Sequence, residues 1–181
     1  MEREILLYIQ EHMKNDVLDY LMRGITFLSN SGWIWILCAV ILLSIKKYRS
    51  YGYALATGLV LCFLIGNVTL KPLIARTRPY DFYEDFNLIV NALHTFSFPS
   101  GHTYTAFCGA TVLFSVNKKI GYAALSLALL TAFSRLYLLV HYPSDVLAGA
   151  VMGVALGFIS IRCVRLIESR FTQRKVSRDA R

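Results

Sequence analysis

The sequence is poor in charged residues, and acidic residues are the scarcer kind. Only 17% of its 181 residues are charged, with 19 lysines and arginines against 11 aspartates and glutamates. Soluble domains usually carry about a quarter charged residues, so this scarcity argues against a soluble protein. The length fits one domain, 1–181, and 56% of the residues are hydrophobic. The composition therefore indicates a single domain embedded in a membrane.

Cysteine is also scarce, and its placement argues against cysteine-based sites. None of the four cysteines has CxxC spacing or stands beside a histidine, and each lies in or at the edge of an apolar run: Cys38, Cys62, Cys108 and Cys163. We interpret them as small buried hydrophobic side chains. Aspartate and glutamate form no cluster that suits a metal ion. We therefore expect no cofactor and no bound metal.

The excess of basic residues does not indicate nucleic-acid binding. The net charge is +8, but lysine and arginine fall in short clusters between long apolar runs. A nucleic-acid-binding surface needs a basic patch or stripe, whereas clusters between apolar runs are typical of membrane topology. We expect the lipid bilayer as a partner, with no nucleic acid and no obligate protein partner evident.

Five apolar runs predict an all-α membrane helix bundle. They are Gly32–Ile45, Gly52–Leu70, Thr103–Val116, Ile120–Val140 and Val146–Val164. About 20 apolar residues are needed to cross the bilayer core. The second, fourth and fifth runs meet that length, and the first and third reach it only with flanking residues. The bundle is therefore expected to have at least five spans.

The first 30 residues show a different pattern, in which apolar residues recur at helical spacing among charged ones. Asn15 and Asp16 form a plausible helix start between two such segments. This pattern predicts amphipathic helices over 1–30 that lie on the bilayer surface. The alternative is that this region supplies a first membrane span, which would make a bundle of six.

The distribution of charge predicts the orientation of the bundle. With five spans, Lys46, Lys47, Lys118 and the basic tail 166–181 fall on one side. The other side carries the connection 71–102, in which acidic residues offset the basic ones: Asp81, Glu84 and Asp85. The positive-inside rule places the basic side in the cytoplasm. The C-terminus is then cytoplasmic and the connection 71–102 extracytoplasmic.

The first of three polar clusters on the predicted outer side contains Lys71 and Arg78. Seven residues make nearly two helical turns, so these two share a face if the helix continues beyond the membrane, and Arg76 points well away from both. An arginine fork beside a lysine point charge suits a phosphate dianion. The alternative is a pair of anchors whose charges reach into the headgroup region.

The second cluster is Pro99-Ser100-Gly101-His102, directly before an apolar run. Ser100 can cap the helix, Gly101 lets the backbone approach a ligand closely, and free N–H groups at a helix start bind anions. His102 then sits at the edge of the site, where it can donate a proton. An ordinary capped helix with an interfacial histidine is the alternative.

The third cluster is Ser134-Arg135 followed by His141 and Asp145. An arginine inside an apolar span costs about 2.5 kcal/mol or more on insertion scales, so Arg135 needs a partner or a function. Asp145 can return to His141 across a tight turn, and a carboxylate on one ring nitrogen leaves the other as a nucleophile. A structural clamp between two helices would explain the pair but not Arg135.

Together the three clusters resemble the signature of the type 2 phosphatidic acid phosphatase superfamily. They read Lys71-x6-Arg78-Pro79, Pro99-Ser100-Gly101-His102 and Ser134-Arg135-x5-His141-x3-Asp145, with all positions filled in order. That superfamily includes bacterial undecaprenyl-diphosphate and phosphatidylglycerophosphate phosphatases, and it shares its site with vanadium haloperoxidases. The resemblance implies a metal-independent membrane phosphatase whose substrate is a lipid phosphate.

The resemblance also implies a role for each residue of the signature. His141 would attack phosphorus to form a phosphohistidine, with Asp145 orienting it. His102 would protonate the leaving oxygen and then activate water. The remaining residues would hold the phosphoryl oxygens and stabilise charge in the transition state: Lys71, Arg78, Ser100, Gly101 through its N–H, and Arg135. These cations would take the place of a metal.

The substrate is less sharply indicated than the reaction. The amphipathic start and a first span near Trp33 resemble small bacterial undecaprenyl-diphosphate phosphatases, although some of those carry aspartate in place of Gly101. The glycine form also occurs in phosphatidate and phosphatidylglycerophosphate phosphatases. Undecaprenyl diphosphate is therefore the favoured substrate, with these two lipids as alternatives.

Three other functions are alternatives to a phosphatase. An anion transporter or channel would need polar residues through the bilayer, but here they stop at one face. A vanadate-binding peroxidase would be soluble, which the composition argues against. A lipid phosphotransferase, in which an acceptor hydroxyl replaces water, has the same residues and stays open.

Overall fold

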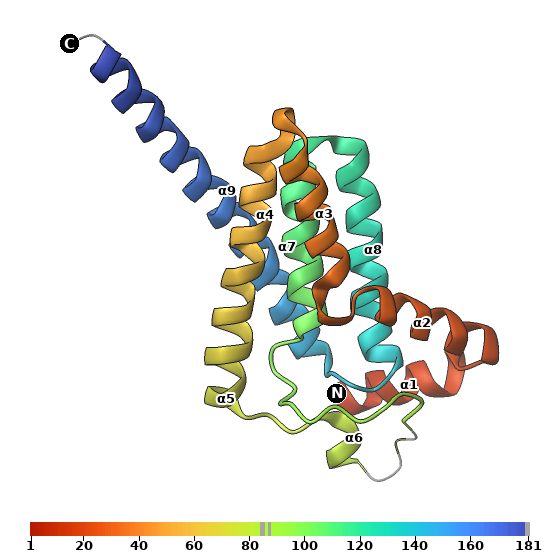
Figure 1. Ribbon diagram of the computed structural model, residues 1–181. Helices are drawn as coiled ribbons and strands as arrows, with labels where there is room; N and C mark the ends of the chain where they lie inside the picture. Colours follow the sequence, from red (N-terminus) through yellow and green to blue (C-terminus); the bar gives the residue numbers. More distant parts are fainter. Residues whose placement is uncertain (84–85, 87, 180–181) are drawn as a thin grey trace.

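The computed structural model describes residues 1–83, 86 and 88–179, and the described chain is helical without strands (Figure 1). Glu84, Asp85 and the last two residues of the expected tail lie outside the described residues. The main helices are α1 Glu2–Met13, α2 Asp16–Leu28, α3 Trp33–Ser44, α4 Arg49–Cys62, α7 Gly101–Val116, α8 Lys118–Tyr137 and α9 Pro143–Asp179. A π-helix, η3 Phe63–Leu70, joins α4 to the short α5 Lys71–Ile74, and α6 spans Pro79–Phe82. The all-α prediction is confirmed.

Helices α3, α4, α7, α8 and α9 run side by side as a bundle (Figure 1). Helix α7 lies at its centre and packs against α4, α8 and α9. The α3–α4 and α7–α8 connections and the C-terminus lie at one end of the bundle. Helices α1, α5 and α6, the start of α7 and the α8–α9 turn lie at the other. We call the latter the site end.

The close packing of α7 on α9 depends on three glycines spaced four residues apart. A Cβ atom on Gly149, Gly153 or Gly157 would lie within 3 Å of α7 or the residue before it, at the carbonyl oxygen of Ser100 or Tyr104 or the Cβ of Thr111. Small residues at this spacing let helix backbones approach closely in membranes. As a result, the backbone N–H of Ser100 donates to the carbonyl of Asp145 at 3.1 Å, which fixes the start of α7 on the start of α9.

Three described helical segments are long and apolar enough to cross a membrane. They are Lys46–Phe82, Lys118–Tyr137 and Pro143–Phe171, and the pair α2 and α3, bent by 46°, makes a fourth if it counts as one span. Helix α7 has only 16 residues. The expected five to six spans are therefore not confirmed by this criterion, although five helices run through the bundle.

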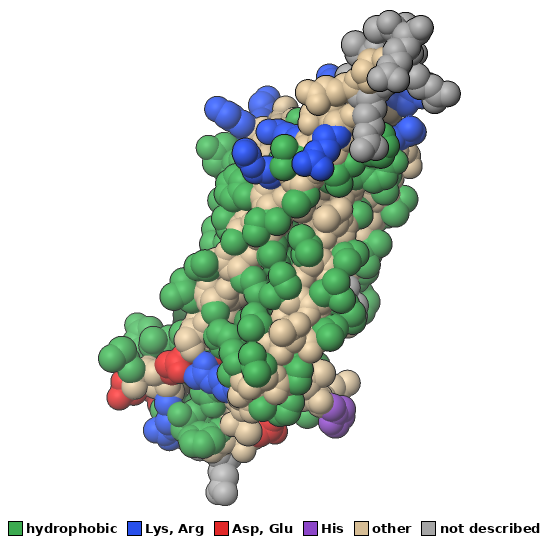
Figure 2. Space-filling model, turned by 90° about the vertical axis from the view of Figure 1, so that its left-hand side faces the viewer, with side chains coloured by type: hydrophobic (Ala, Val, Ile, Leu, Met, Phe, Trp, Pro, Cys, Tyr) green, Lys and Arg blue, Asp and Glu red, His purple; other side chains and the backbone are tan. Residues whose placement is uncertain are grey.

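The two ends of the bundle differ in charge as the sequence predicts. Lysine and arginine side chains gather at the end opposite the site, and hydrophobic side chains cover the middle of the molecule (Figure 2). The site end carries both acidic and basic side chains. A basic end, an apolar belt and a mixed end are the pattern of a multi-pass membrane protein.

The two predicted N-terminal helices are present and lie crosswise to the bundle at the site end (Figure 1). The predicted start of the second is confirmed, because the Asn15 side chain accepts a hydrogen bond of 2.9 Å from the Leu18 N–H. Polar contacts attach α2 to α8: Ser29 bonds to Thr131 at 2.7 Å, and Tyr137 donates to Asp19 at 2.6 Å.

The approach of α3 to α7 gives a test of the packing. A Cβ atom on Gly109 would lie 2.2 Å from the ring of the buried Trp35, so Gly109→Ala must displace that ring. Overpacking of this kind costs about 1–3 kcal/mol. We expect a lower Tm in detergent, followed by tryptophan fluorescence. Gly24→Ala is the control, because no atom lies within 4 Å of its added methyl. Equal Tm values for the two variants would contradict this packing.

Candidate active site

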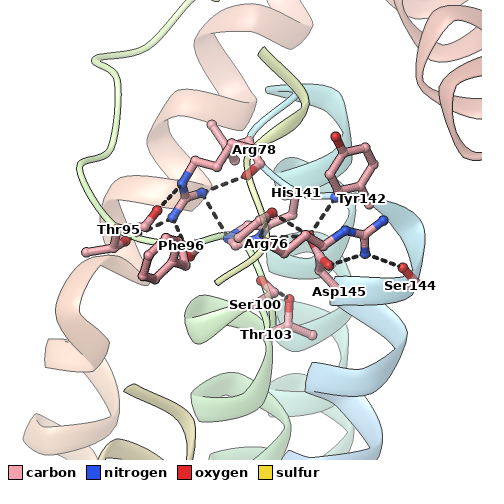
Figure 3. A network of polar contacts seen from close by, with 12 residues as sticks. Arg76, Arg78, Thr95, Phe96, Ser100, Thr103, His141, Tyr142, Ser144 and Asp145 are labelled. Carbon is pink, nitrogen blue, oxygen red and sulfur yellow. Dashed lines mark hydrogen bonds and ion pairs between the residues drawn. The ribbon is translucent and has the colours of Figure 1, made fainter. Parts of the chain in front are cut away.

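Four of the predicted site residues, Arg78, Ser100, His141 and Asp145, come together at the site end, where the 71–100 connection, the start of α7 and the α8–α9 turn meet (Figure 3). Four of the predicted residues have ionisable side chains and are almost fully buried: Arg78, Arg135, His141 and Asp145. Buried polar groups need hydrogen-bond partners to offset the loss of water. The partners of these four residues therefore define the chemistry of the site.

The predicted return of Asp145 to His141 is confirmed. Oδ2 of Asp145 lies 3.5 Å from Nδ1 of His141 and also accepts a hydrogen bond of 3.0 Å from the N–H of Tyr142. The carboxylate is thus tied to the turn that carries the histidine. Because α9 begins at Pro143, Asp145 lies in its first turn.

The hydroxyl group of Ser97 joins this pair and was not found from the sequence. Ser97 Oγ donates to Oδ2 of Asp145 at 2.5 Å and lies 3.3 Å from Nδ1 of His141. A hydroxyl has a single proton. Since that proton goes to the carboxylate, Oγ accepts from Nδ1, which must then carry the hydrogen. The Nε2 atom of a neutral His141 therefore keeps its lone pair.

The environment of His141 also keeps the ring neutral. Its burial lowers the pKa to about 3, although the hydrogen bond to Asp145 opposes this shift and the charges of Arg135 and Arg78 reinforce it. At neutral pH the ring is then uncharged. A neutral imidazole with hydrogen on Nδ1 presents Nε2 as a nucleophile.

Arg78 lies against this nitrogen, with its Nη1 atom 3.4 Å from Nε2 of His141 (Figure 3). Its guanidinium is held by the carbonyls of Thr95 and Val140, both at 2.7 Å, and by the hydroxyl of Thr95 at 3.0 Å. These bonds fix the positive charge beside Nε2 of His141. Preorganised charge of this kind stabilises the charge that develops in a transition state.

The predicted geometry of Lys71 and Arg78 is wrong, although both reach the site. Helix α5 ends at Ile74 and Ala75 has a left-handed backbone with φ of 48°, so no helix continues to Arg78. Arg78 is extended because the following Pro79 disfavours helical backbone at the preceding residue. Lys71 arrives from the other side, with Nζ 3.9 Å from the position that a Cβ on Gly101 would take.

The expectation that Arg76 points away from the site is also wrong. Its Nη1 atom lies 2.6 Å from Oδ1 of Asp145, and its Nη2 atom lies 2.6 Å from Oε2 of Glu2. The break between Ala75 and Arg78 turns Arg76 toward the start of α9. It therefore contacts the carboxylate that lies beside His141.

The start of α7 is placed as predicted, but Ser100 does not cap it. Ser100 is the residue before the helix, yet its Oγ forms no cap bond and accepts a hydrogen bond of 2.9 Å from Thr103. His102 lies in the first turn of α7, where its burial and then the charges of Arg135 and the other cations of the site lower the pKa of its ring well below the ordinary value. A Cβ atom on Gly101 would contact the Tyr104 hydroxyl at 3.4 Å and the Lys71 Nζ at 3.9 Å.

Arg135 is buried with few partners. Its guanidinium donates to the hydroxyl of Thr26 in α2, its Nε atom has no partner, and it forms no ion pair with a carboxylate among the described residues. The site thus gathers three cations: Arg78 lies beside Nε2 of His141, Lys71 lies near Gly101, and Arg135 is buried in the last turn of α8. An arrangement with this much unpaired positive charge suits an anion such as phosphate.

Within the part of the chain that the structure describes, no group of three or more His, Cys, Asp or Glu side chains could hold a metal ion.

Comparisons with known proteins show the family of the chain. The chain matches the PAP2 superfamily over residues 33–168. It is 33% identical over 139 residues to an undecaprenyl-diphosphatase of Sulfolobus acidocaldarius, covering 75% of this chain and 67% of the relative. It is 34% identical over 152 residues to undecaprenyl-diphosphatase BcrC of Bacillus subtilis, covering 82% and 76%.

A solved structure is similar along most of the chain. The transmembrane PAP2-type phosphatidylglycerolphosphate phosphatase from Bacillus subtilis superimposes with a TM-score of 0.75 at 26% identity, covering 93% of this chain and 85% of that one. This protein belongs to the PAP2 superfamily. It is a phosphatase of that family, built as a multi-pass membrane protein.

The position of Ser97 generates a test of the orienting network. Ser97→Ala removes a donor to a charged oxygen, an interaction worth about 1.5–3 kcal/mol, so kcat should fall about ten- to hundredfold. Steady-state phosphate release in detergent micelles measures this. Ser160→Ala is the control, because that buried serine bonds only within α9, to the Gly157 carbonyl at 2.8 Å. A wild-type kcat for Ser97→Ala would contradict the assigned tautomer.

Proposed function

We propose that the protein hydrolyses a lipid diphosphate or phosphate, with undecaprenyl diphosphate as the favoured substrate, through a phosphohistidine on His141. The observation that carries this proposal is the state of that ring. Nδ1 is held by Ser97 and Asp145, and Nε2 faces the guanidinium of Arg78. A lone pair beside a fixed cation is suited to attack on phosphorus.

The first half-reaction is transfer of the phosphoryl group to the enzyme. Nε2 of His141 forms a bond to phosphorus while the bond between phosphorus and the leaving oxygen breaks. His102 gives its proton to that oxygen, because the negative charge of the bound phosphate raises the pKa of its ring, and Asp145 offsets the positive charge that develops on His141. Phosphoryl transfer depends on positioning and electrostatics. The phosphoryl oxygens are therefore held by Ser100, by the N–H of Gly101 and by the three cations Lys71, Arg78 and Arg135.

The second half-reaction returns the enzyme to its starting state. His102, now without its proton, accepts one from water, and the water oxygen forms a bond to phosphorus. The bond between phosphorus and Nε2 of His141 breaks, and inorganic phosphate leaves. One group thus acts as acid and then as base. If an alcohol replaced water here, the same residues would act as a lipid phosphotransferase.

The relatives support a lipid diphosphate as the substrate. Two of them are named undecaprenyl-diphosphatases, and they share about a third of their aligned residues with this chain. The similar solved structure is a phosphatidylglycerolphosphate phosphatase, so that lipid is the second candidate, followed by phosphatidate. Each has an apolar tail and a terminal phosphate, which fits a phosphate site at the edge of an apolar belt (Figure 2).

We also propose that the site faces away from the cytoplasm and that the C-terminus is cytoplasmic. Lysine and arginine gather at the end of the bundle opposite the site, around the α3–α4 and α7–α8 connections and along α9 (Figure 2). Positive residues favour the cytoplasmic side. A lipid substrate would then enter from the outer leaflet.

A panel assay with a nucleophile variant tests the proposed function. Phosphate release from undecaprenyl diphosphate, phosphatidylglycerophosphate and phosphatidate is measured for the wild type and for His141→Ala. Loss of the nucleophile should reduce release at least about a thousandfold, with undecaprenyl diphosphate the best substrate of the wild type. His94→Ala is the control, because that histidine is exposed.

Two results would contradict the proposal. One is undiminished phosphate release by His141→Ala from every lipid tested. The other is loss of wild-type activity in a chelator with recovery on adding magnesium, because the proposed mechanism uses side-chain cations alone.

A further inference from the structure

A chain of ion pairs connects the first turn of α1 to the carboxylate beside His141. Nη1 of Arg76 lies 2.6 Å from Oδ1 of Asp145, and Nη2 lies 2.6 Å from Oε2 of Glu2. The other oxygen of Glu2 accepts a hydrogen bond of 3.0 Å from the N–H of Ser144. Glu2 thus caps an N–H group at the start of α9, the helix that carries Asp145.

Arg76 is fixed by more than these charges. Its Nη1 atom also donates to the hydroxyl of Ser144 at 2.6 Å, and its guanidinium carbon lies 3.9 Å from the centre of the Tyr142 ring (Figure 3). Two carboxylates, a hydroxyl and an aromatic face leave the guanidinium little freedom. Planar, many-sided contacts of this kind favour arginine over lysine.

Glu2 is ionised at neutral pH and completes the charge balance. Burial raises the pKa of Glu2, but the hydrogen bonds from Ser144 and Arg76 and the charge of Arg76 bring it below its ordinary value. The order of charges is then negative, positive, negative along Glu2, Arg76 and Asp145. Glu2 therefore holds Arg76 against Asp145.

The two carboxylate oxygens of Asp145 have different hydrogen-bond partners. Oδ2 accepts from Ser97 and from the N–H of Tyr142, and it faces Nδ1 of His141. Oδ1 accepts from Arg76. The last torsion angle of an aspartate side chain has a broad distribution, so a carboxylate that is bound at only one oxygen rotates easily. A bond to Arg76 at the second oxygen prevents this rotation.

We propose that Arg76 and Glu2 are positioning residues, which hold the Asp145 carboxylate so that Oδ2 stays at Nδ1 of His141. This inference rests on the proposed function, in which Asp145 orients the nucleophile. Arg76 contacts neither His141 nor the cations that would hold phosphate. Its loss should therefore slow the chemical step and leave substrate binding almost unchanged.

The test compares kcat and KM for a graded set of variants. Arg76→Gln removes the charge, Arg76→Lys keeps it without the planar fork, and Glu2→Gln removes the support behind it. Orienting partners of a histidine–carboxylate pair are typically worth about ten- to hundredfold in activity. We expect that loss in kcat for Arg76→Gln, a smaller loss for Arg76→Lys and Glu2→Gln, and KM within about threefold throughout. Glu4→Gln, exposed on the same helix, is the matched control and should behave as wild type.

A second readout needs no substrate. In protein labelled with ¹⁵N-histidine, the ring shifts of His141, assigned with His141→Gln, report which nitrogen carries the proton. We expect hydrogen on Nδ1 alone in the wild type and in Glu4→Gln, and a mixture of tautomers in Arg76→Gln.

The outcomes separate this inference from the proposed function. A lower Tm for Arg76→Gln and Glu2→Gln, with wild-type kcat and an unchanged tautomer, would overturn the inference and leave a structural role alone. If the wild type released no phosphate from any lipid, the proposed function would fail. The tautomer measurement would then still decide whether Arg76 orients the Asp145–His141 pair.

Discussion

The hydrogen bonds that converge on Asp145 hold together parts of the chain that lie far apart in the sequence. Its carboxylate binds Ser97, Arg76 and the N–H of Tyr142, and its backbone carbonyl accepts from the N–H of Ser100. These contacts join the 71–100 connection, the start of α7 and the start of α9 at one point. A buried carboxylate requires such partners, because an unpaired charge away from water is costly. The orientation of His141 depends on these hydrogen bonds, because they fix the carboxylate that lies beside its ring.

The helix bundle makes this convergence possible through close backbone packing. Glycines spaced along α9 bring it against α7, so the first turns of the two helices meet where the signature residues lie. The same region holds three cations, Lys71, Arg78 and Arg135. The Nδ1 side of the ring faces Ser97 and Asp145, and the Nε2 side faces Arg78. The crosswise helices also contact the site: Glu2 of α1 pairs with Arg76, and Thr26 of α2 accepts a hydrogen bond from Arg135.

The sequence predicted the residues of the site better than their geometry. Pairing of His141 with Asp145 was foreseen because a four-residue separation across a turn limits where the carboxylate can go. Arg76 was misplaced because the helix was assumed to continue past Ala75, although Pro79 already disfavours a helical Arg78. Ser97 carried no local signal, since its role depends on a contact across 48 positions of the chain. Helical periodicity identifies elements, but it does not identify contacts between loops.

The proposed mechanism depends most directly on His141 acting as the nucleophile through Nε2. Rapid alkaline quenching of the enzyme during turnover of undecaprenyl diphosphate, followed by mass spectrometry of the peptides, measures where a covalent phosphate resides. The proposed mechanism predicts a base-stable, acid-labile phosphate on Nε2 of His141, and none on the peptide that contains His102. Phosphate on His102 or on Ser100, or turnover without any phosphoenzyme, would contradict it.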